Sequence, residues 1–341
     1  MMDGNGNIKV PEELKAKYLF RLPQAYNFAD YIWPGLLMSP QRILAIRDIE
    51  FQPSDIIIAS YPKSGTTWVS ELVSAIVHNG DTEAIKAKRQ HERVPWLELN
   101  TDYAWVKLYD FWQSAQKALG YSPTVKEEDE KKSKPVARVW FTHLPLELLP
   151  KSALEGGCRI IYVSRNPKDN AVSFFHFHQM ARFLGQQTTT WEEFFPLYAS
   201  GDIYCGSWFE HVLSYWTFSR VNKHVLFLKY EDMKKDLSRE VSNICDFIDF
   251  DLDNEARKRV IHHCTFDTMK NNRMANREGV WLFNQARSKF MRKGVVGDWK
   301  NYFTVGQSEI FDQLYSYKMK GSNLDYEFDP EEPFEGEKTK L

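Results

Sequence analysis

The chain has few cysteines, and none of them is spaced as a metal ligand. Its 341 residues include 4 cysteines, and no pair stands at the C-x-x-C spacing that is typical of zinc or redox sites. We therefore expect reduced, buried thiols at Cys158, Cys205, Cys245 and Cys264. The sequence also lacks an N-x-[S/T] sequon, which fits a chain that does not enter the secretory pathway.

Long apolar runs and a strong net charge are missing as well. No stretch approaches the ~18 consecutive apolar residues of a membrane span. The N-terminus, MMDGNGNIKVPEELK, has no apolar run and so does not resemble a signal peptide. The net charge of −2 is too close to zero for a protein that coats nucleic acid. We expect a cytoplasmic protein without membrane or nucleic-acid partners, in which any recognition of anions is local.

What the sequence does contain is an alternation of short apolar runs and helical patterns. The runs typical of strands covered on both faces are Asp55–Tyr61, Arg138–His143, Arg159–Arg165 and Val225–Tyr230. After the first run, Thr66–His78 places apolar side chains at helical spacing. The pattern predicts a single α/β domain with a central parallel sheet flanked by helices. We expect an N-terminal tail and lead-in segment over 1–30, the domain over 31–328, and a disordered acidic tail over 329–341.

The loop between the first expected strand and helix, YPKSGTTW, has the features of an anion site. Lys63 supplies a charge, Gly65 permits a close approach, and the following helix begins with free N–H groups and a partial positive charge. A capped strand–helix junction with an exposed lysine would explain the same residues. The loop is not a Walker A sequence, because there the lysine follows the second glycine, whereas Lys63 precedes Gly65. This difference argues against an ATPase or GTPase.

Two further segments are basic. Arg165 ends the third expected strand and Ser173 falls about two turns into the next helix, so both can face one anion. A surface ion pair between Arg165 and Asp169 is the alternative. Arg292 and Lys293 could hold a second anion together, or they could be ordinary solvated surface.

These three sites, in this order, resemble the cytosolic sulfotransferases. YPKSGTTW resembles the family's 5′-phosphosulfate loop, YVSRNPKDNAVSFFHF its 3′-phosphate segment, and RKGVVGDWKNYFT its C-terminal element. The resemblance covers roughly Tyr31 to Phe328 and implies a P-loop-like phosphosulfate-binding loop. It also implies 3′-phosphoadenosine 5′-phosphosulfate (PAPS) as donor, adenosine 3′,5′-bisphosphate (PAP) as product, and a small-molecule acceptor with a hydroxyl or amine. No metal is implied.

The resemblance assigns roles to individual residues. The donor site that it implies comprises Lys63, Ser64, Gly65, Thr66, Thr67 and Trp68 at the 5′ end, Arg165, Ser173, Arg292, Lys293 and Gly294 at the 3′-phosphate, and Tyr230, Thr265, Phe266, Met269, Phe290 and Met291 along the nucleotide. The implied catalytic residues are Lys63, which stabilises the bridging oxygen, and His143 in THLP, the general base. An ordinary histidine pKa near 6.5 suits that role. The implied acceptor-binding residues are Phe141, Thr142, His143 and Phe177.

Two departures from the family pattern concern the acceptor. Many members read KTHLP, whereas this chain has Phe141 in place of that lysine, which removes a cation near the transferring sulfuryl group and adds an aromatic wall. The segment 95–135 is longer than in typical vertebrate members and is either core or an acceptor lid, which would favour a phenol or sterol-like alcohol. Two alternatives stay open: a related dehydratase acting through a transient sulfate ester, and a non-catalytic nucleotide-binding relative. The intact Lys63 and His143 argue against the latter.

The segment after the third motif concerns assembly. Lys300, Thr304, Val305 and Glu309 match the family's dimerisation pattern K-x-x-x-T-V-x-x-x-E. Paired antiparallel across a two-fold axis, Lys300 would meet the partner subunit's Glu309, and the two valines would meet near the axis. The resemblance therefore implies a homodimer, and the alternative is a plain turn with Val305 in the core.

Overall fold

The centre of the molecule is a four-stranded parallel sheet in the order β4-β3-β5-β6. In the computed structural model, which describes residues 8–99, 137–187 and 189–329, the strands are β3 (Ile56–Ala59), β4 (Val139–Thr142), β5 (Arg159–Ser164) and β6 (Val225–Lys229). The register places Ile57 between Trp140 on one neighbour and Ile160 on the other. The four expected strands and their parallel arrangement are confirmed.

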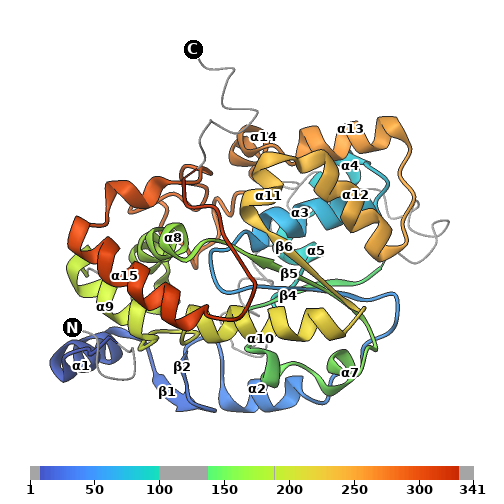
Figure 1. The fold of residues 1–341 in the computed structure, drawn as a ribbon. Helices are drawn as coiled ribbons and strands as arrows, with labels where there is room; N and C mark the ends of the chain where they lie inside the picture. The colour runs from blue at the N-terminus through green and yellow to red at the C-terminus, as the bar shows by residue number, and fades with distance from the viewer. Residues whose placement is uncertain (1–7, 100–136, 188, 330–341) are drawn as a thin grey trace.

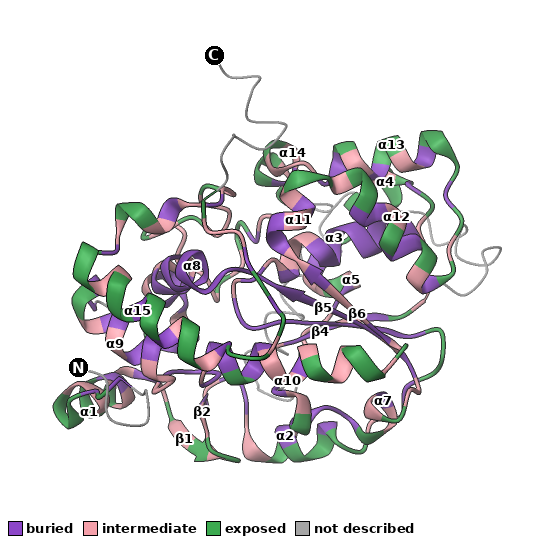
Figure 2. Cartoon of the chain, in the orientation of Figure 1, coloured by how far each residue is buried: buried purple, intermediate pink, exposed green. Residues whose placement is uncertain are grey.

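Both faces of this sheet are covered by helices, which explains the continuous apolar runs. Ile58, Ile161 and Val163 pack into a core shared with α3 (Thr66–Val77), α12 (Leu237–Ile248) and α13 (Asn254–His263). Alternate residues such as Ile160 and Tyr162 face the core formed with α8 (Pro167–Met180) and α10 (Trp208–Val221). Figure 1 shows α3, α12 and α13 on one side of the sheet and α10 on the other. In Figure 2, β3, β4, β5 and α8 are buried along most of their length.

Helix α3 lies deeper than its pattern predicted. Its expected apolar face is confirmed, but every residue from Val69 to Ile76 is buried, including Glu71. The Glu71 carboxylate is compensated by Arg93 at 2.9 Å and His263 at 2.8 Å. A buried charge is tolerated only with such partners.

The lead-in segment packs on the same core as the rest of the chain. It contains α1 (Glu12–Arg21) and β1 (Ala25–Phe28), and β1 pairs antiparallel with β2 (Tyr31–Pro34) across the position where the domain was expected to begin. The side chain of Tyr18 on α1 is buried in the core beside α8, where its hydroxyl bonds His178 at 3.1 Å.

Shorter elements complete the fold. They are α2 (Pro40–Ile46), α4 (Thr82–Lys86), α5 (Gln90–Arg93), η2 (Leu146–Leu148), α7 (Lys151–Leu154), η3 (Arg182–Leu184), α9 (Trp191–Ser200), α11 (Tyr230–Lys235), α14 (Phe266–Asn271), η4 (Asp298–Asn301) and α15 (Val305–Lys318). The four cysteines are free and buried, as expected. Within the described residues, no helix is both long and apolar enough to cross a membrane. Most of the expected lid, 100–135, and the acidic tail after Asp329 lie outside the described residues.

Candidate functional site

The loop between β3 and α3 is held in an unusual backbone conformation. Lys63 has a φ of 71° and Gly65 a φ of 120°, both in the region that favours glycine. A Cβ atom at Gly65 would lie 3.2 Å from the ring of Tyr230. The side-chain amide of Asn170 on α8 donates to the carbonyl of Pro62 at 2.9 Å, which ties the loop down from the other side. The loop is therefore a fixed cradle at the N-terminus of α3, where N–H groups and the helix dipole favour an anion.

The ammonium group of Lys63 lies among aromatic rings and other cations. Its Nζ is 4.1 Å from the ring centre of Phe290 and 4.9 Å from that of Phe177. Burial lowers the pKa of Lys63 to about 7, and the charges of Arg165 and Arg292 act in the same direction. The alternative of an exposed lysine is wrong. An anion bound beside this group would raise its pKa again.

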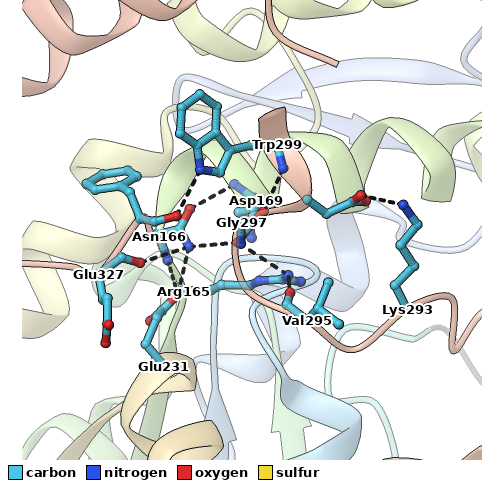
Figure 3. A network of polar contacts seen from close by, with 12 residues as sticks. Arg165, Asn166, Asp169, Glu231, Lys293, Val295, Gly297, Trp299 and Glu327 are labelled. Atoms are coloured by element: carbon cyan, nitrogen blue, oxygen red, sulfur yellow. Dashed lines mark hydrogen bonds and ion pairs between the residues drawn. The ribbon is translucent and has the colours of Figure 1, made fainter. Parts of the chain in front are cut away.

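The second motif forms a network around Arg165 and Asp169 (Figure 3). The guanidinium of Arg165 donates to the Val295 carbonyl at 2.8 Å, lies 4.5 Å from the ring centre of Tyr230, and is 3.8 Å from the Asp169 carboxylate. Both charged side chains are buried, so this is not the surface ion pair of the alternative. The Nε of Arg165 is buried and has no hydrogen-bond partner in the described part of the chain. A donor atom of this kind fits a site that receives an oxyanion.

Asp169 also joins the second motif to the third. Its two carboxylate oxygens accept the N–H groups of Gly297 at 2.8 Å and Trp299 at 2.9 Å. Arg292 and Lys293 each donate to Asp298. Burial opposes ionisation of Asp298, but these hydrogen bonds outweigh it and hold its pKa below the ordinary value. The two segments, more than a hundred residues apart in sequence, thus form one basic region.

Only glycine fits at position 294, because of its backbone conformation and a neighbouring ring. Its φ is 72°, and a Cβ atom there would lie only 2.3 Å from the ring of Phe266. Phe266 begins α14, which Thr265 caps by accepting the N–H of Thr268. Met269 on the same helix is buried. The predicted nucleotide residues of this segment therefore lie against the third motif.

Trp68 and Tyr230 connect the loop to this region. Their rings are 5.3 Å apart, and the indole N–H of Trp68 donates to the Cys264 carbonyl at 2.8 Å. Ser173 is half-buried on α8, one turn beyond Asp169, and Met291 is half-buried beside the core on the α3 side of the sheet. The structure thus gathers two basic regions with a tryptophan–tyrosine pair between them.

His143 follows β4 and is held from two directions. Its Nδ1 lies 2.8 Å from the Ser60 carbonyl, and its backbone N–H donates to the buried Glu98 carboxylate at 2.5 Å. Because a carbonyl can only accept, the proton is assigned to Nδ1 and Nε2 keeps its lone pair. Burial lowers the pKa of His143 to about 4, and the charge of Lys63 acts in the same direction. The imidazole is therefore neutral at neutral pH with its lone pair free on Nε2, but in the free protein it is a weaker base than the ordinary histidine expected from the sequence.

A comparison with known proteins decides the family. The family model of the sulfotransferase domain matches residues 53–323.

This chain belongs to the sulfotransferase family.

The relatives agree in sequence and in fold. Sulfotransferase 1B1 of the dog, Canis lupus familiaris, is 41% identical over 284 residues, which are 82% of this chain and 88% of the relative. A structure of retinol dehydratase in complex with androsterone and inactive cofactor PAP is 27% identical, with a TM-score of 0.74 over 92% of this chain and 95% of that chain. Mouse sulfotransferase SULT7A1 complexed with PAP is 31% identical, with a TM-score of 0.66 over 88% and 96% of the two chains.

Around His143 and the Lys63 ammonium, this sulfotransferase gathers aromatic rings. Phe141 stacks on Trp96 with ring centres 5.5 Å apart, and each of them lies 5.7 Å from the ring of His143. Phe177 continues this cluster from α8, with Phe183 at 5.9 Å and Phe290 at 6.2 Å. Phe141 and Phe177 were predicted from the sequence. Thr142, also predicted, is buried and accepts the N–H of Leu144 at 3.1 Å, so it shapes the turn after His143.

Several residues that build the sulfotransferase site were missed. Asn170 binds the loop after β3, and Glu98 and Ser60 hold His143. Asp298 accepts hydrogen bonds from Arg292 and Lys293. Arg277 lies with its Cζ 5.7 Å from the ring centre of Phe141. Asn170 and Asp298 stand within motifs that were recognised. Glu98, Ser60 and Arg277 gave no signal, because nothing local distinguishes them from ordinary polar residues. Among the described residues, no group of three or more His, Cys, Asp or Glu side chains is placed to hold a metal ion.

The segment after the third motif presents Val305 to solvent. Thr304 caps α15 by accepting the N–H of Gln307 at 3.2 Å, and Val305, the first residue of that helix, is 77% exposed. The alternative that Val305 lies in the core is therefore wrong. Lys300 forms an ion pair with Asp329 at 2.7 Å, and Glu309 is exposed.

Proposed function

We propose that this sulfotransferase transfers the sulfuryl group of PAPS to a hydroxyl or amine of a small apolar acceptor, aromatic or sterol-like, and releases PAP. The observation that carries the proposal is that the loop after β3 and the Arg165 guanidinium both lie against the ring of Tyr230, which is paired with Trp68. His143, whose Nε2 keeps its lone pair, is fixed to Ser60 just before the same loop. A donor with phosphate groups at both ends of a nucleoside needs this arrangement. The retinol dehydratase and mouse sulfotransferase structures, both with PAP bound, support it.

The donor side would bind by charge and by stacking. The cradle of Lys63 to Thr67 would hold the 5′ end, because N–H groups at the start of α3 and the Lys63 ammonium face the same anion. Arg165, with its unpartnered Nε, and the Arg292–Lys293 pair would hold the 3′-phosphate. Trp68 would lie along the adenine.

The transfer step needs only one proton acceptor and one cation. His143 Nε2 would take the proton of the acceptor hydroxyl as its oxygen bonds to sulfur, and the bond from sulfur to the bridging oxygen breaks. The charge that develops on this leaving oxygen would be stabilised by Lys63. In-line placement supplies much of the remaining rate enhancement, since the leaving group is already a good one.

Binding and turnover test this proposal separately. Calorimetry with adenosine 3′,5′-bisphosphate should show one site per chain. A screen of phenols, sterols and aliphatic alcohols with sulfuryl-labelled donor should then give a labelled product with at least one class. No binding of the bisphosphate would overturn the donor assignment, and binding without any transfer would leave the non-catalytic relative as the better description.

A net dehydration is the second candidate function. It is favoured by the likeness to retinol dehydratase, which extends over 95% of that chain. There the sulfate ester would form first and then be eliminated from the acceptor, so that one hydroxyl and one hydrogen leave. Mass spectrometry of the products separates the two reactions. A gain of one sulfuryl group supports transfer, and the loss of one water from the acceptor supports dehydration.

We also propose a homodimer through Lys300, Thr304, Val305 and Glu309. The exposed Val305 at the start of α15 supports this proposal, since a large apolar side chain there gains from being covered. An interface this short falls below the ~1,200 Å² of standard complexes and so depends on single residues.

The dimer can be tested with one pair of variants. Val305→Glu brings two carboxylates together at the axis and should give a monomer by sedimentation, with fold and activity retained. Val221→Glu is the matched control, because Val221 is 85% exposed on another helix and should not change the mass. A Val305→Glu protein that stays dimeric at low micromolar concentration shows that the interface lies elsewhere.

A further inference from the structure

Arg277 is a buried cation on the aromatic side of the site. Only 8% of it is exposed, and it lies in the loop that follows α14. Its Cζ is 5.7 Å from the ring centre of Phe141 and 6.0 Å from that of Phe290. Phe141 in turn contacts the ring of His143. The guanidinium therefore lies at the aromatic cluster that surrounds His143, close enough that, besides burial, its charge helps lower the pKa of both His143 and Lys63.

The hydrogen bonds of Arg277 are incomplete. Its Nη2 donates to the side-chain oxygen of Gln90 at 3.0 Å, whereas its buried Nε has no partner in the described part of the chain. Gln90 is itself fixed, because its amide nitrogen donates to the Thr67 carbonyl and to Glu71. Arg277 is thus held in place by Gln90, and its buried Nε has no hydrogen-bond partner among the described residues.

The charge of Arg277 is not balanced by a neighbouring carboxylate. No ion pair of Arg277 is found among the described residues, and the carboxylate that acts on it, Glu71, already binds Arg93 and His263. Burial lowers the pKa of Arg277 to about 10, so it stays charged at neutral pH. Burying an unpaired charge costs free energy that a bound anion can return.

We propose that Arg277 is a specificity-determining residue that selects acceptors carrying an anionic group, such as a carboxylate, on an aromatic skeleton. This inference rests on the proposed function and names the acceptor class for the same site. The aromatic cluster takes the skeleton, His143 the hydroxyl, and Arg277 the carboxylate. Lys63 lies on the same Phe290 ring, so the alternative role for Arg277 is to hold oxygens of the transferring sulfuryl group. The position of the guanidinium over Phe141, whose ring contacts that of His143, favours the acceptor.

The test compares acceptors that differ in charge alone. Para-hydroxybenzoate, para-hydroxyphenylacetate and para-hydroxyphenylpropionate are each measured against the neutral amide of the same skeleton, which varies the reach from hydroxyl to carboxylate. For the skeleton of matching length, kcat/KM should favour the carboxylate roughly ten- to a hundred-fold, as expected for a charge-assisted hydrogen bond. A wild-type enzyme that sulfates the amides but prefers no carboxylate overturns the proposal.

Variants show whether Arg277 causes the preference. Arg277→Gln should lower kcat/KM for the carboxylate more than for the amide and so bring the ratio of the two values close to one, and Arg277→Lys should keep part of the preference. Arg220→Gln is the matched control, because Arg220 also lies over a ring, that of Trp216, but on α10 outside the site. An equal fall in kcat for amide and carboxylate in Arg277→Gln contradicts the proposal and assigns the charge to the sulfuryl group.

Two readouts separate this inference from the proposed function. Bisphosphate affinity should be unchanged in Arg277→Gln, and the thermal midpoint reports whether the variant is folded. If the proposed function fails, wild type neither binds the bisphosphate nor sulfates any amide. If only this inference fails, the amides are sulfated and the charge preference is absent or survives in Arg277→Gln.

Discussion

The site has a basic side, with Arg165, Arg292 and Lys293, and an aromatic side, where aromatic rings surround His143. The cations on the two sides differ in whether they have a carboxylate partner. On the basic side, Arg165 is paired with Asp169, and Arg292 and Lys293 share Asp298. On the aromatic side, Lys63 and Arg277 lie over phenylalanine rings, and neither forms an ion pair with a described carboxylate. Cations that are already paired hold their geometry before a ligand arrives. Cations that are unpaired and buried gain the most when an anion binds.

The two sides also differ in how the chain builds them. The basic side comes from the second and third motifs, which Asp169 joins. The aromatic side is assembled from six rings in four stretches of the chain, at Trp96, at Phe141, at Phe177 with Phe183, and at Phe283 with Phe290. Residues within one contiguous motif keep fixed positions around one ligand. Rings that come from separate stretches of the chain can be substituted one at a time. We therefore expect changes on the basic side to act on donor binding and changes around His143 to act on turnover or on the choice of acceptor.

The largest expected effect is that of His143→Ala. Loss of the proton acceptor should lower kcat by at least ~10²-fold, and bisphosphate affinity should stay near wild type because His143 lies outside the basic regions. Steady-state kinetics with labelled donor and calorimetry measure the two quantities. His262→Ala, at an exposed histidine, is the control. Near-normal kcat in His143→Ala would show that another group takes the proton.

Arg165→Ala should act on the donor alone. Removing a charge-assisted pair should weaken bisphosphate binding roughly ten- to a hundred-fold while the acceptor KM changes little. Arg159→Ala is the matched variant, since Arg159 begins the strand that Arg165 follows and lies at its other end. Equal dissociation constants for Arg165→Ala and wild type, measured by calorimetry, would remove Arg165 from the phosphate site.

Gly294→Ala separates backbone strain from a steric clash. Gly294 and Gly321 both have a positive φ, at 72° and 79°, but only at Gly294 does an added Cβ meet another atom, the ring of Phe266 at 2.3 Å. Gly321→Ala should cost about 1 kcal/mol of stability and leave bisphosphate affinity unchanged. Gly294→Ala should displace Phe266 and weaken bisphosphate binding several-fold. This loss of affinity should exceed what the loss of stability explains. Equal affinity in both variants, beside measured thermal midpoints, would contradict the packing assigned to Gly294.

The last prediction is a pH dependence of donor binding that comes from Lys63. Its pKa is about 7 in the free protein, and an anion bound beside it raises this value. Below pH 7 the lysine is already charged, so affinity is flat; above pH 7 binding takes up a proton and weakens by up to about tenfold per pH unit. Calorimetry in buffers of different ionisation enthalpy measures the uptake. Lys63→Met should abolish both the uptake and the slope, and Lys63→Arg should abolish them while keeping affinity. A slope that persists in Lys63→Met comes from another group.

The sequence predicted most of what local order controls. The apolar run before Lys63 and the helical spacing after Trp68 are sufficient to place a buried strand, a loop and a helix in that order. In the same way, the apolar run before Arg165 and the helical pattern after it are sufficient to place a strand and a helix on either side of this residue. The lead-in segment was harder to predict, because the pairing of β1 with β2 depends on a hairpin turn at Ala29 and Asp30, two non-glycine residues with positive φ. A glycine at these positions would have indicated a positive φ in the sequence, whereas alanine and aspartate do not.

By itself, then, the sequence determined the parallel α/β framework and the three basic motifs, since each depends on residues that are neighbours in the chain. Only the tertiary structure decided which charges are paired and which are not. Asp169 meets Gly297 across 128 residues, whereas Arg277 lies beside Phe141 and forms no ion pair with any carboxylate of the described segments. The physical reason is that desolvation and Coulomb energies depend on distances between side chains, and the fold sets those distances after the local pattern has been satisfied. The low pKa of His143 and the unbalanced charge of Arg277 are therefore properties of the fold.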